Sequence, residues 1–213
     1  MSDNKESPTM PRKAVYRLTV YQRCLQTLLG NGFETVSSEA LAKAAGVKST
    51  QLRKDLGYVG QFGTRGLGYN AATLSDAITE TLGSTRLRPV VLIGVGNLGS
   101  ALLGYKGFQK EGFEIVGAFD QAPADVRTDS LEGAAIPLFQ SDELAGFIKK
   151  NEVKMAILAV PGPAAQGVAN EIVGAGVQAI LNFSPTVLQV PESVTVNNVD
   201  LALELESLSY FVK

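Results

Sequence analysis

The sequence RPVVLIGVGNLGSALLGY, residues 88–105, passes from an apolar run through three glycines into a helical pattern. The run Val90–Ile93 has the length and β-branched composition of a buried strand. Gly94 would permit a tight turn, Gly96 would let a pyrophosphate approach the backbone, and Gly99 would let the helix pack on the strand. This order of strand, glycine turn and helix predicts a dinucleotide-binding unit, although glycines also serve ordinary turns.

The backbone of this turn is the first candidate cofactor site. In a dinucleotide-binding unit the pyrophosphate accepts hydrogen bonds from the free amides at the helix N-terminus. The cofactor-binding residues predicted in the turn are Gly94, Val95, Gly96, Asn97, Leu98 and Gly99.

A carboxylate follows the next apolar run. Residues 113–119 read as a strand that ends at Asp120, where this fold places an acidic residue to accept the ribose hydroxyls of adenosine. No arginine occurs in residues 121–124 to bind a 2′-phosphate, which favours NAD(H) over NADP(H). The alternative is a solvated loop aspartate.

Two more buried strands are predicted in KMAILAVPG, residues 154–162, and VQAILNFSP, residues 177–185, with a helical stretch, Ala164–Ala175, between them. Strands that alternate with helices indicate a parallel sheet, whose ligands collect at the carboxyl ends of the strands. The residues predicted to lie there, beside the nicotinamide half, are Val160, Pro161, Asn182 and Ser184. Equally, the prolines could serve only to end the strands.

The chain has no histidine and one cysteine, Cys24. Hydride transfer to a carbonyl needs a proton donor near neutral pH, usually histidine or a tuned lysine or tyrosine. A tyrosine and lysine pair stays open, but nothing assembles a convincing acid, so we expect no catalytic residues. The single cysteine also excludes an intrachain disulfide and a cysteine-rich zinc site, and no metal is expected.

Composition and charge bound the class of protein. A chain of 213 residues with 45% apolar composition can bury a core. The absence of a long apolar run and of a signal peptide predicts a cytoplasmic protein with no membrane partner. Residues 1–88 carry 12 Lys and Arg against 7 Asp and Glu, whereas residues 89–213 carry 7 against 14. Such asymmetry suits a nucleic-acid-binding module on a metabolite-binding body, although solvated surfaces also produce it.

Three helical patterns precede the dinucleotide unit. The first occupies residues 11–32, and the second follows a cap at Ser37 or Ser38 and ends at Gly46. The third begins at a predicted cap, Ser49. Two helices joined by a tight turn that contains glycine are typical of a helix-turn-helix.

The third helix has the composition of a DNA-recognition helix. Leu52 and Leu56 lie one turn apart and should point into the core, which turns the polar side chains outward. Arginine pairs with guanine and glutamine with adenine, whereas lysine more often contacts phosphate. The DNA-binding residues predicted on this helix are Ser49, Thr50, Gln51, Arg53 and Lys54. A merely solvated polar face is the alternative.

A glycine-rich segment, GYVGQFGTRGLGYN at residues 57–70, follows this helix. The alternation of glycines and aromatic residues predicts a hairpin, or wing, with its tip at residues 63–66. Arg65 at that tip could enter a narrow minor groove, where the negative potential is strongest.

The chain as a whole resembles the Rex family of redox-sensing transcriptional repressors. The resemblance rests on SSEALAKAAGVKSTQLRKDLGYVGQFGTRGLGY, LIGVGNLGSAL, AILAVP, ILNFSP and VDLALELESLSYF, which occur in this order between about residues 11 and 212. It implies a homodimer that binds palindromic, A/T-rich operator DNA and releases it when NADH rises relative to NAD+.

The fold class expected is α/β, with an N-terminal winged helix-turn-helix and a C-terminal Rossmann-like doubly wound sheet that carries a domain-swapped C-terminal helix. We expect a flexible N-terminus at residues 1–10, a winged-helix domain at 11–84, an NAD(H)-binding domain at 85–198 and the swapped helix at 199–213. The tail places Leu201, Leu205, Leu208 and Val212 on one helical stripe that must bury against something.

The resemblance also implies roles for single residues. Arg17 and Asp200 match a state-dependent ion pair, and Tyr105 would lie at the nicotinamide. Leu201 stands where relatives often have an aromatic residue, which leaves the packing against the ring open. An apolar closed pocket around Tyr105 would prefer the neutral NADH over the cationic NAD+, because desolvating the cation costs more.

Two other functions compete with this hypothesis. The first is an NAD-dependent oxidoreductase whose N-terminal segment serves oligomerisation. The second is a module that binds coenzyme A or a nucleotide and does not bind DNA.

Overall fold

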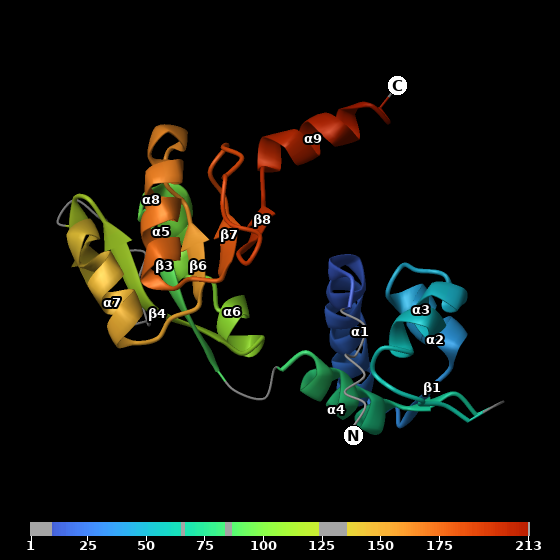
Figure 1. Ribbon diagram of the computed structural model, residues 1–213. Helices are drawn as coiled ribbons and strands as arrows, with labels where there is room; N and C mark the ends of the chain where they lie inside the picture. The colour runs from blue at the N-terminus through green and yellow to red at the C-terminus, as the bar shows by residue number, and fades with distance from the viewer. Residues whose placement is uncertain (1–9, 65–66, 84–86, 124–135, 213) are drawn as a thin grey trace, which may run out of the picture. The chain divides into compact units, whose positions relative to one another are not determined.

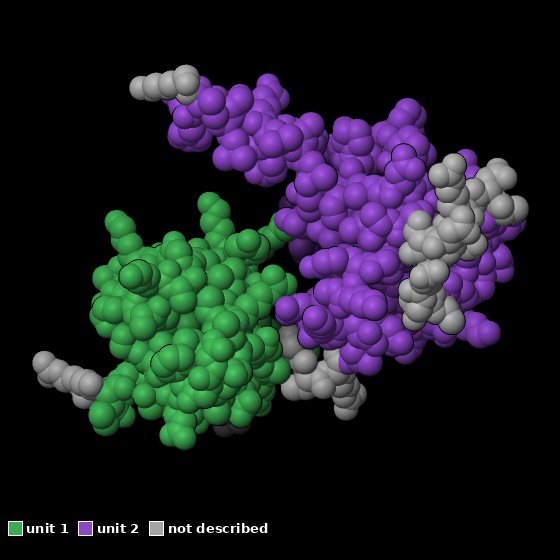
Figure 2. All heavy atoms as spheres, turned by 180° about the vertical axis from the view of Figure 1, so that it is seen from behind, with its two compact units in different colours: residues 1–86 green, residues 87–213 purple. Residues whose placement is uncertain are grey.

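The structure is a computed structural model, and it describes residues 10–64, 67–83, 87–123 and 136–212. The chain forms two compact units, Met1–Arg86 (unit 1) and Leu87–Lys213 (unit 2), coloured green and purple in Figure 2. The boundary expected between residues 84 and 85 lies outside the described residues. No helix in the described part of the chain is both long and apolar enough to cross a bilayer.

Unit 1 consists mainly of helices. They are α1 (Arg12–Gly30), α2 (Ser38–Ala44), α3 (Ser49–Leu56) and α4 (Ala71–Thr81). Their buried faces meet in one core that includes Leu18, Tyr21, Leu25, Leu41, Leu52, Leu56, Leu74 and Ile78. Leu52 and Leu56 of α3 therefore point inward as their spacing predicts.

Helix α4 was not among the helices predicted from the sequence, although its signals are present. The Asn70 side chain accepts a hydrogen bond of 2.9 Å from the backbone N–H of Thr73 and so caps the helix. Ala71, Leu74 and Ile78 are buried along one side of α4.

The N-caps of α2 and α3, the two helices of the predicted helix-turn-helix, differ in kind. Ser37 caps α2 as predicted, since its hydroxyl accepts a hydrogen bond of 3.1 Å from the N–H of Ala40. The prediction that Ser49 caps α3 is wrong. Lys48 is the N-cap, because its backbone is extended and its carbonyl accepts the first helical bond, and Ser49 is the first helical residue.

The structure describes part of the predicted wing. An antiparallel bridge joins Thr64 to Gly68, and the tip with Arg65 lies outside the described residues. Strand β2 (Tyr69–Asn70) pairs with β1 (Thr35–Val36), a partner that the sequence did not indicate. Gly68 has a φ of +81°, and a Cβ there would collide with the Val36 carbonyl, so this position requires glycine.

Unit 2 is built on one parallel sheet (Figure 1). Its strands are β3 (Arg88–Ile93), β4 (Phe113–Asp120), β5 (Leu138–Gln140), β6 (Met155–Leu158), β7 (Ala179–Asn182) and β8 (Thr195–Asn198). The spatial order is β5-β4-β3-β6-β7-β8, which is the doubly wound order of dinucleotide-binding folds. The chain runs outward from β3 to β5 and then crosses to β6, so the switch point lies beside β3.

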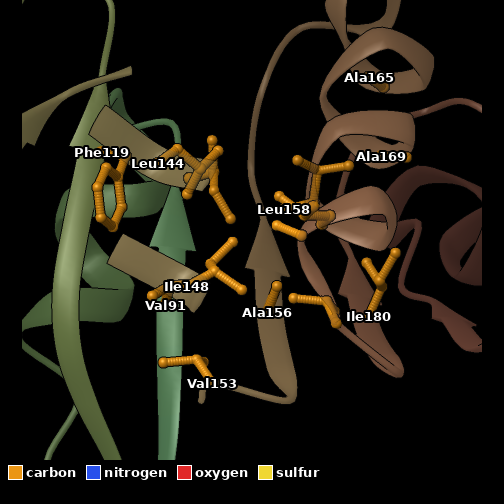
Figure 3. Packing of buried hydrophobic residues seen from close by; sticks show 14 of the residues in the cluster. Val91, Phe119, Leu144, Ile148, Val153, Ala156, Leu158, Ala165, Ala169 and Ile180 are labelled. Atoms are coloured by element: carbon orange, nitrogen blue, oxygen red, sulfur yellow. The ribbon is translucent and has the colours of Figure 1, made fainter. Parts of the chain in front are cut away.

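Helices cover both faces of this sheet. α7 (Leu144–Lys150) and α8 (Gly162–Ala175) pack on one face, where Val91, Phe119 and Leu158 contribute to the buried cluster in Figure 3. α5 (Asn97–Leu103) and α6 (Gly107–Lys110) pack on the other face, and a 3₁₀ turn, η3 (Ser141–Glu143), precedes α7. The strand ends next to β3 thus remain accessible between these layers.

Helix α9 (Leu201–Ser209) follows β8 and ends the described chain. The Asp200 carboxylate caps it by accepting hydrogen bonds of 3.0 and 3.1 Å from the N–H groups of Ala202 and Leu203. Every described residue from Leu201 to Val212 is exposed, including the predicted apolar stripe. The stripe is therefore uncovered within the chain.

Candidate functional site

A cleft of about 490 Å³ lies at the carboxyl ends of β3, β4 and β6. This is the switch point of the sheet, where folds of this type bind their ligands. Its lining residues are Ile93, Gly94, Gly96, Phe119, Asp120, Gln121, Ser141, Ala159, Val160, Pro161, Ala164 and Val168.

The turn after β3 is hydrogen-bonded to the ends of both neighbouring strands, β4 and β6. The N–H of Gly94 donates a hydrogen bond of 2.8 Å to the carbonyl of Phe119, and Ala159 donates one of 2.8 Å to Ile93. Gly94 has a φ of +91°, and a Cβ there would lie 2.6 Å from the Ala159 carbonyl oxygen. Glycine is therefore required both by the backbone conformation and by the space.

The other two glycines have different surroundings. A Cβ at Gly99 would collide with the carbonyl oxygen of Gly94, so α5 packs directly against the turn. A Cβ at Gly96 would meet no atom within 4 Å, and Gly96 lines the cleft. The backbone at Gly96 is thus open to a ligand, and the amides of the first turn of α5 lack helical acceptors. These features fit a pyrophosphate.

Asp120 is tied to the glycine turn. One carboxylate oxygen accepts a hydrogen bond of 2.7 Å from the N–H of Val95, and the other accepts one of 3.0 Å from Ala122. Each carboxylate oxygen has a further lone pair, so Asp120 can still accept a ribose hydroxyl. It therefore shapes the turn as well as lining the cleft, a second task that the sequence did not indicate.

Of the remaining predicted residues in the turn and at the end of β6, only some line the cleft. Val160 and Pro161 line the cleft. Val95 is 4% exposed and belongs to the core on the α5 side of the sheet, so its backbone and not its side chain faces the turn. Asn97 and Leu98 begin α5 and are exposed.

Tyr105 follows α5 and is not among the described residues that line the cleft. Its ring is 59% exposed and packs edge to face on Phe108, with 5.1 Å between ring centroids. The ring also covers Gly107, where a Cβ would collide with it. Its predicted contact with the nicotinamide stays a prediction.

Asn182 and Ser184 are buried and do not line the described cleft. The Asn182 amide nitrogen donates hydrogen bonds of 2.9 Å to the Thr186 carbonyl and to the side chain of Asn198, and its oxygen accepts one of 3.0 Å from Ser184. Asn182 thus holds the loop after β7 and the end of β8 together. The Ser184 hydroxyl is buried with no hydrogen-bond partner in the described part of the chain.

The outer face of α3 carries the predicted cationic surface. Thr50, Arg53 and Lys54 are exposed, and Ser49 is half-buried. Arg53 lies 3.7 Å from a Glu39 carboxylate oxygen, which is a weak surface pair.

Gln51 differs from these neighbours, because its amide nitrogen donates a hydrogen bond of 2.8 Å to Asp55. Asp55 is buried on the inner side of α3, and sequence reasoning missed it. The Arg17 Nε and Nη2 atoms donate hydrogen bonds of 2.6 and 2.7 Å to its two oxygens, and the Tyr21 hydroxyl donates one of 2.8 Å. The signal was an acidic residue between Leu52 and Leu56 on the apolar side of a helix.

These contacts shift the protonation equilibria. Burial raises the pKa of Asp55, but the hydrogen bonds from Arg17, Tyr21 and Gln51 outweigh it, so its pKa lies below the ordinary value. Burial and the bond to Asp55 raise the pKa of the Tyr21 phenol. Asp55 is thus an anion and Tyr21 a neutral donor at neutral pH.

The predicted pairing of Arg17 with Asp200 stays a prediction, since it would join different units. Within unit 1 Arg17 contacts Asp55, and Asp200 caps α9.

Two family models match the chain. One, described as "Putative DNA-binding protein N-terminus", matches residues 9–57, which include α1, α2 and α3. The other, described as "CoA binding domain", matches residues 85–186, which include the glycine turn and the strands from β3 to β7.

Curated relatives match along nearly the whole chain. A protein of Carboxydothermus hydrogenoformans named "Redox-sensing transcriptional repressor Rex" is 45% identical over 204 residues, which are 96% of this chain and 97% of the relative. A protein of the same name from Streptomyces coelicolor is 46% identical over 201 residues, which are 94% of this chain and 77% of the relative.

Solved structures agree with this result. A structure described as RSP in complex with beta-NAD+ and operator DNA is 36% identical, with a TM-score of 0.85 over 95% of this chain and 92% of that chain. A structure of RSP in complex with beta-NADH is 34% identical, with a TM-score of 0.81 over 96% of this chain and 94% of that chain.

Proposed function

The chain belongs to the Rex family of redox-sensing transcriptional repressors, and on this premise we propose how its own residues perform that function. Unit 2 binds NADH and NAD+ in the cleft at the glycine turn. Unit 1 binds double-stranded operator DNA through α3 and the wing. NADH binding releases the operator.

One observation carries this proposal. The same chain holds a glycine turn that is open at Gly96 beside Asp120, and a helix that exposes Arg53 and Lys54. Relatives whose names state redox-sensing repression match the chain across both units. Since members of the family are named as repressors, the dinucleotide unit is a sensor and the chain is not an enzyme. We place the protein in the cytoplasm, where operator DNA and NAD(H) occur together.

The cleft suits the reduced form of the cofactor for an electrostatic reason. Oxidised nicotinamide is cationic and the reduced ring is neutral, so an apolar surrounding favours NADH. The β6 side of the cleft supplies apolar side chains from Val160, Pro161 and Val168. A coupling free energy of about 2–3 kcal/mol would change operator affinity about 30- to 150-fold, and operator DNA would weaken NADH binding by the same factor.

The described lining also favours NAD(H) over NADP(H). It contains an acidic residue, Asp120, and no cationic side chain among the described lining residues. A 2′-phosphate would lie near that carboxylate, and the two anions repel each other. Asp120 is therefore the residue that selects a free ribose hydroxyl.

The first prediction concerns this selection. Asp120→Asn keeps the size of the side chain but removes its charge and weakens its hold on the N–H of Val95. NADH affinity is expected to fall about 10-fold, and the ratio of NADH to NADPH affinity is expected to fall as well. Calorimetric titration with both cofactors measures this. Operator affinity without cofactor should be retained, and an unchanged NADH affinity would remove Asp120 from the ribose.

We further propose a homodimer in which α9 packs on a second copy of the chain. The Leu201, Leu205 and Leu208 side chains are 60% or more exposed, which leaves a large apolar surface in water. The α5 side of the sheet also has an apolar cavity of about 240 Å³ over β6, β7 and β8. A twofold dimer would match a palindromic operator.

The dimer is tested on α9. Leu205→Glu places a charge in the apolar stripe and is expected to convert the dimer to a monomer at micromolar concentration, because an unpaired charge cannot be buried at low cost. Ser207→Glu adds the same charge to an exposed α9 position outside the stripe and serves as the control. Sedimentation velocity gives both masses. A wild-type monomer, or a dimer in both variants, would contradict the assignment.

The function itself is tested by titration of a protein–operator complex. The duplex is one that the wild-type chain selects from a random-sequence pool. We expect NADH to dissociate the complex at concentrations where NAD+ does not, at constant salt. Equal effects of the two cofactors would exclude redox sensing, and steady oxidation of NADH with carbonyl substrates would favour an oxidoreductase.

A further inference from the structure

We propose that Asp55 is a positioning residue for DNA recognition, and that Arg17, Tyr21 and Gln51 form with it a buried polar network that fixes α3 on α1. The network sets the direction of the Gln51 amide and the presentation of the adjacent Arg53 and Lys54. This inference rests on the proposed function, because it assigns base specificity to α3.

The first argument is the burial of a charge. The Asp55 side chain is 1% exposed, although it is flanked by exposed Lys54 on one side. A buried carboxylate loses its hydration, and a well-packed apolar residue at such a position is often at least as stable. The stability of unit 1 alone therefore does not explain an acidic residue here, whereas a buried ionic group can specify one arrangement of two helices among several.

The second argument is the geometry of the contacts. The Arg17 fork donates to both Asp55 oxygens, and Tyr21 donates to the oxygen that Nε also contacts. Arg17 and Tyr21 lie one turn apart on α1, so both donors project from the same side of that helix. Three directional hydrogen bonds from one helix to a single carboxylate define both the rotation of α3 about its axis and its position along α1.

The third argument concerns Gln51. It lies one turn before Asp55, and its amide nitrogen donates to the oxygen that Arg17 Nη2 also contacts. This bond orients the amide plane, so the Gln51 oxygen and its second amide hydrogen have fixed directions. Bidentate recognition of adenine requires an acceptor and a donor in a fixed orientation. The hydrogen bond to the Asp55 carboxylate gives the Gln51 amide this orientation.

The network also defines a role for Arg17. Moving its guanidinium away from Asp55 would leave a buried carboxylate without its principal cation, which is strongly unfavourable. Arg17 is thus a positioning residue of α3, and any carboxylate from another subunit would have to compete with Asp55.

The test uses the full-length chain with Asp55→Asn, which keeps the shape of the side chain. Asparagine has one acceptor oxygen instead of two and carries no charge, so it cannot accept all four hydrogen bonds, and the hold on Arg17 and on the Gln51 amide weakens. Affinity for the selected operator is expected to fall about 10-fold, and affinity for a scrambled duplex of equal composition to change less than about 2-fold. NADH affinity should not change. Repeating the selection with the variant should show relaxed preference at one base pair in each half-site.

The outcomes separate the alternatives. Equal losses for operator and scrambled duplex, or full operator specificity in a folded variant, would overturn the inference. If Asp55→Asn does not fold, Tyr21→Phe removes one hydrogen bond and is expected to lower the specificity ratio about 3-fold, whereas an unchanged ratio would overturn the inference. A wild-type chain that prefers no duplex, or does not respond to NADH, would instead refute the proposed function.

Discussion

Gly99→Ala is expected to abolish measurable NADH binding and to destabilise unit 2, whereas Gly96→Ala is expected to weaken NADH binding and leave the fold intact. The two glycines belong to the same turn and differ in what surrounds them. A Cβ at Gly99 would collide with the Gly94 carbonyl oxygen, while a Cβ at Gly96 would meet no atom within 4 Å. The first substitution therefore alters the packing of α5 on the turn. The second adds a methyl group only where the ligand would bind.

The magnitudes follow from these contacts. A backbone atom cannot move aside as a side chain can, so Gly99→Ala must displace α5 from the turn, at a cost of about 1–3 kcal/mol. The displaced amides no longer meet the pyrophosphate, and each charge-assisted hydrogen bond is worth about 1.5–3 kcal/mol. Loss of two such bonds lowers NADH affinity by more than about 100-fold. Gly96 has a φ of −72°, which alanine adopts without strain, so its variant loses about 10-fold in affinity alone.

Thermal unfolding and calorimetric titration with NADH give both quantities for each variant. Gly174→Ala is the matched control, because Gly174 lies in α8 with no atom within 4 Å of a Cβ. Alanine is the better helix former, so this control should be at least as stable as the wild type. A Gly99→Ala protein with normal stability and affinity would show that α5 does not pack on the turn as described. A loss of stability in Gly96→Ala would show that Gly96 is required for packing of the turn and not only for contact with the ligand.

The glycine turn shows what a sequence can predict. Its fold depends on residues that are close in the chain, and the strand, the three glycines and the helix lie within 88–105. Strands β3, β4, β6 and β7 were predictable for a similar reason, because each contains a short apolar run. Strands β5 and β8 and the pairing of β1 with β2 were not predicted, since these strands are short or polar and have little periodicity of their own.

The buried network could not be predicted because its members are distant in sequence. Arg17 and Asp55 are separated by 38 positions, and each taken alone is a charged residue on an amphipathic helix. Their pairing depends on how α1 and α3 cross, which is a property of packing. Asn182 is similar, since its hydrogen bond to Asn198, which connects the ends of β7 and β8, also depends on packing, and its predicted contact with the cofactor stays a prediction.

Arg53→Ala is expected to abolish specific operator binding while leaving NADH affinity unchanged. The Arg53 side chain is 49% exposed on the outer face of α3, and its contact to Glu39 at 3.7 Å is too weak to hold it. A bidentate arginine–guanine contact is worth about 1–3 kcal/mol, and a twofold dimer would lose it in both half-sites. The combined loss of about 2–6 kcal/mol corresponds to a reduction of operator affinity by at least about 30-fold. The cofactor cleft lies in unit 2, so the NADH affinity of the free protein should not change.

Arg53→Lys distinguishes a base contact from a phosphate contact. Lysine keeps the charge but lacks the planar fork, so it replaces arginine at a phosphate and not at guanine. If Arg53 contacts a base, the lysine variant should bind the operator nearly as poorly as the alanine variant and should bind a scrambled duplex normally. If it contacts phosphate, the lysine variant should resemble the wild type, and the alanine variant should reduce the slope of affinity against salt by about one unit per half-site.

Glu39→Ala is the control for this experiment. It removes the surface partner of Arg53, so operator affinity should stay the same or rise slightly, because Arg53 is then free of a nearby anion. Filter binding or fluorescence anisotropy at fixed salt measures all three variants on the same duplex. If operator affinity falls as much in Glu39→Ala as in Arg53→Ala, the loss arises from the pair and not from DNA contact. An Arg53→Ala protein that retains operator affinity would remove α3 from the groove and transfer recognition to the wing.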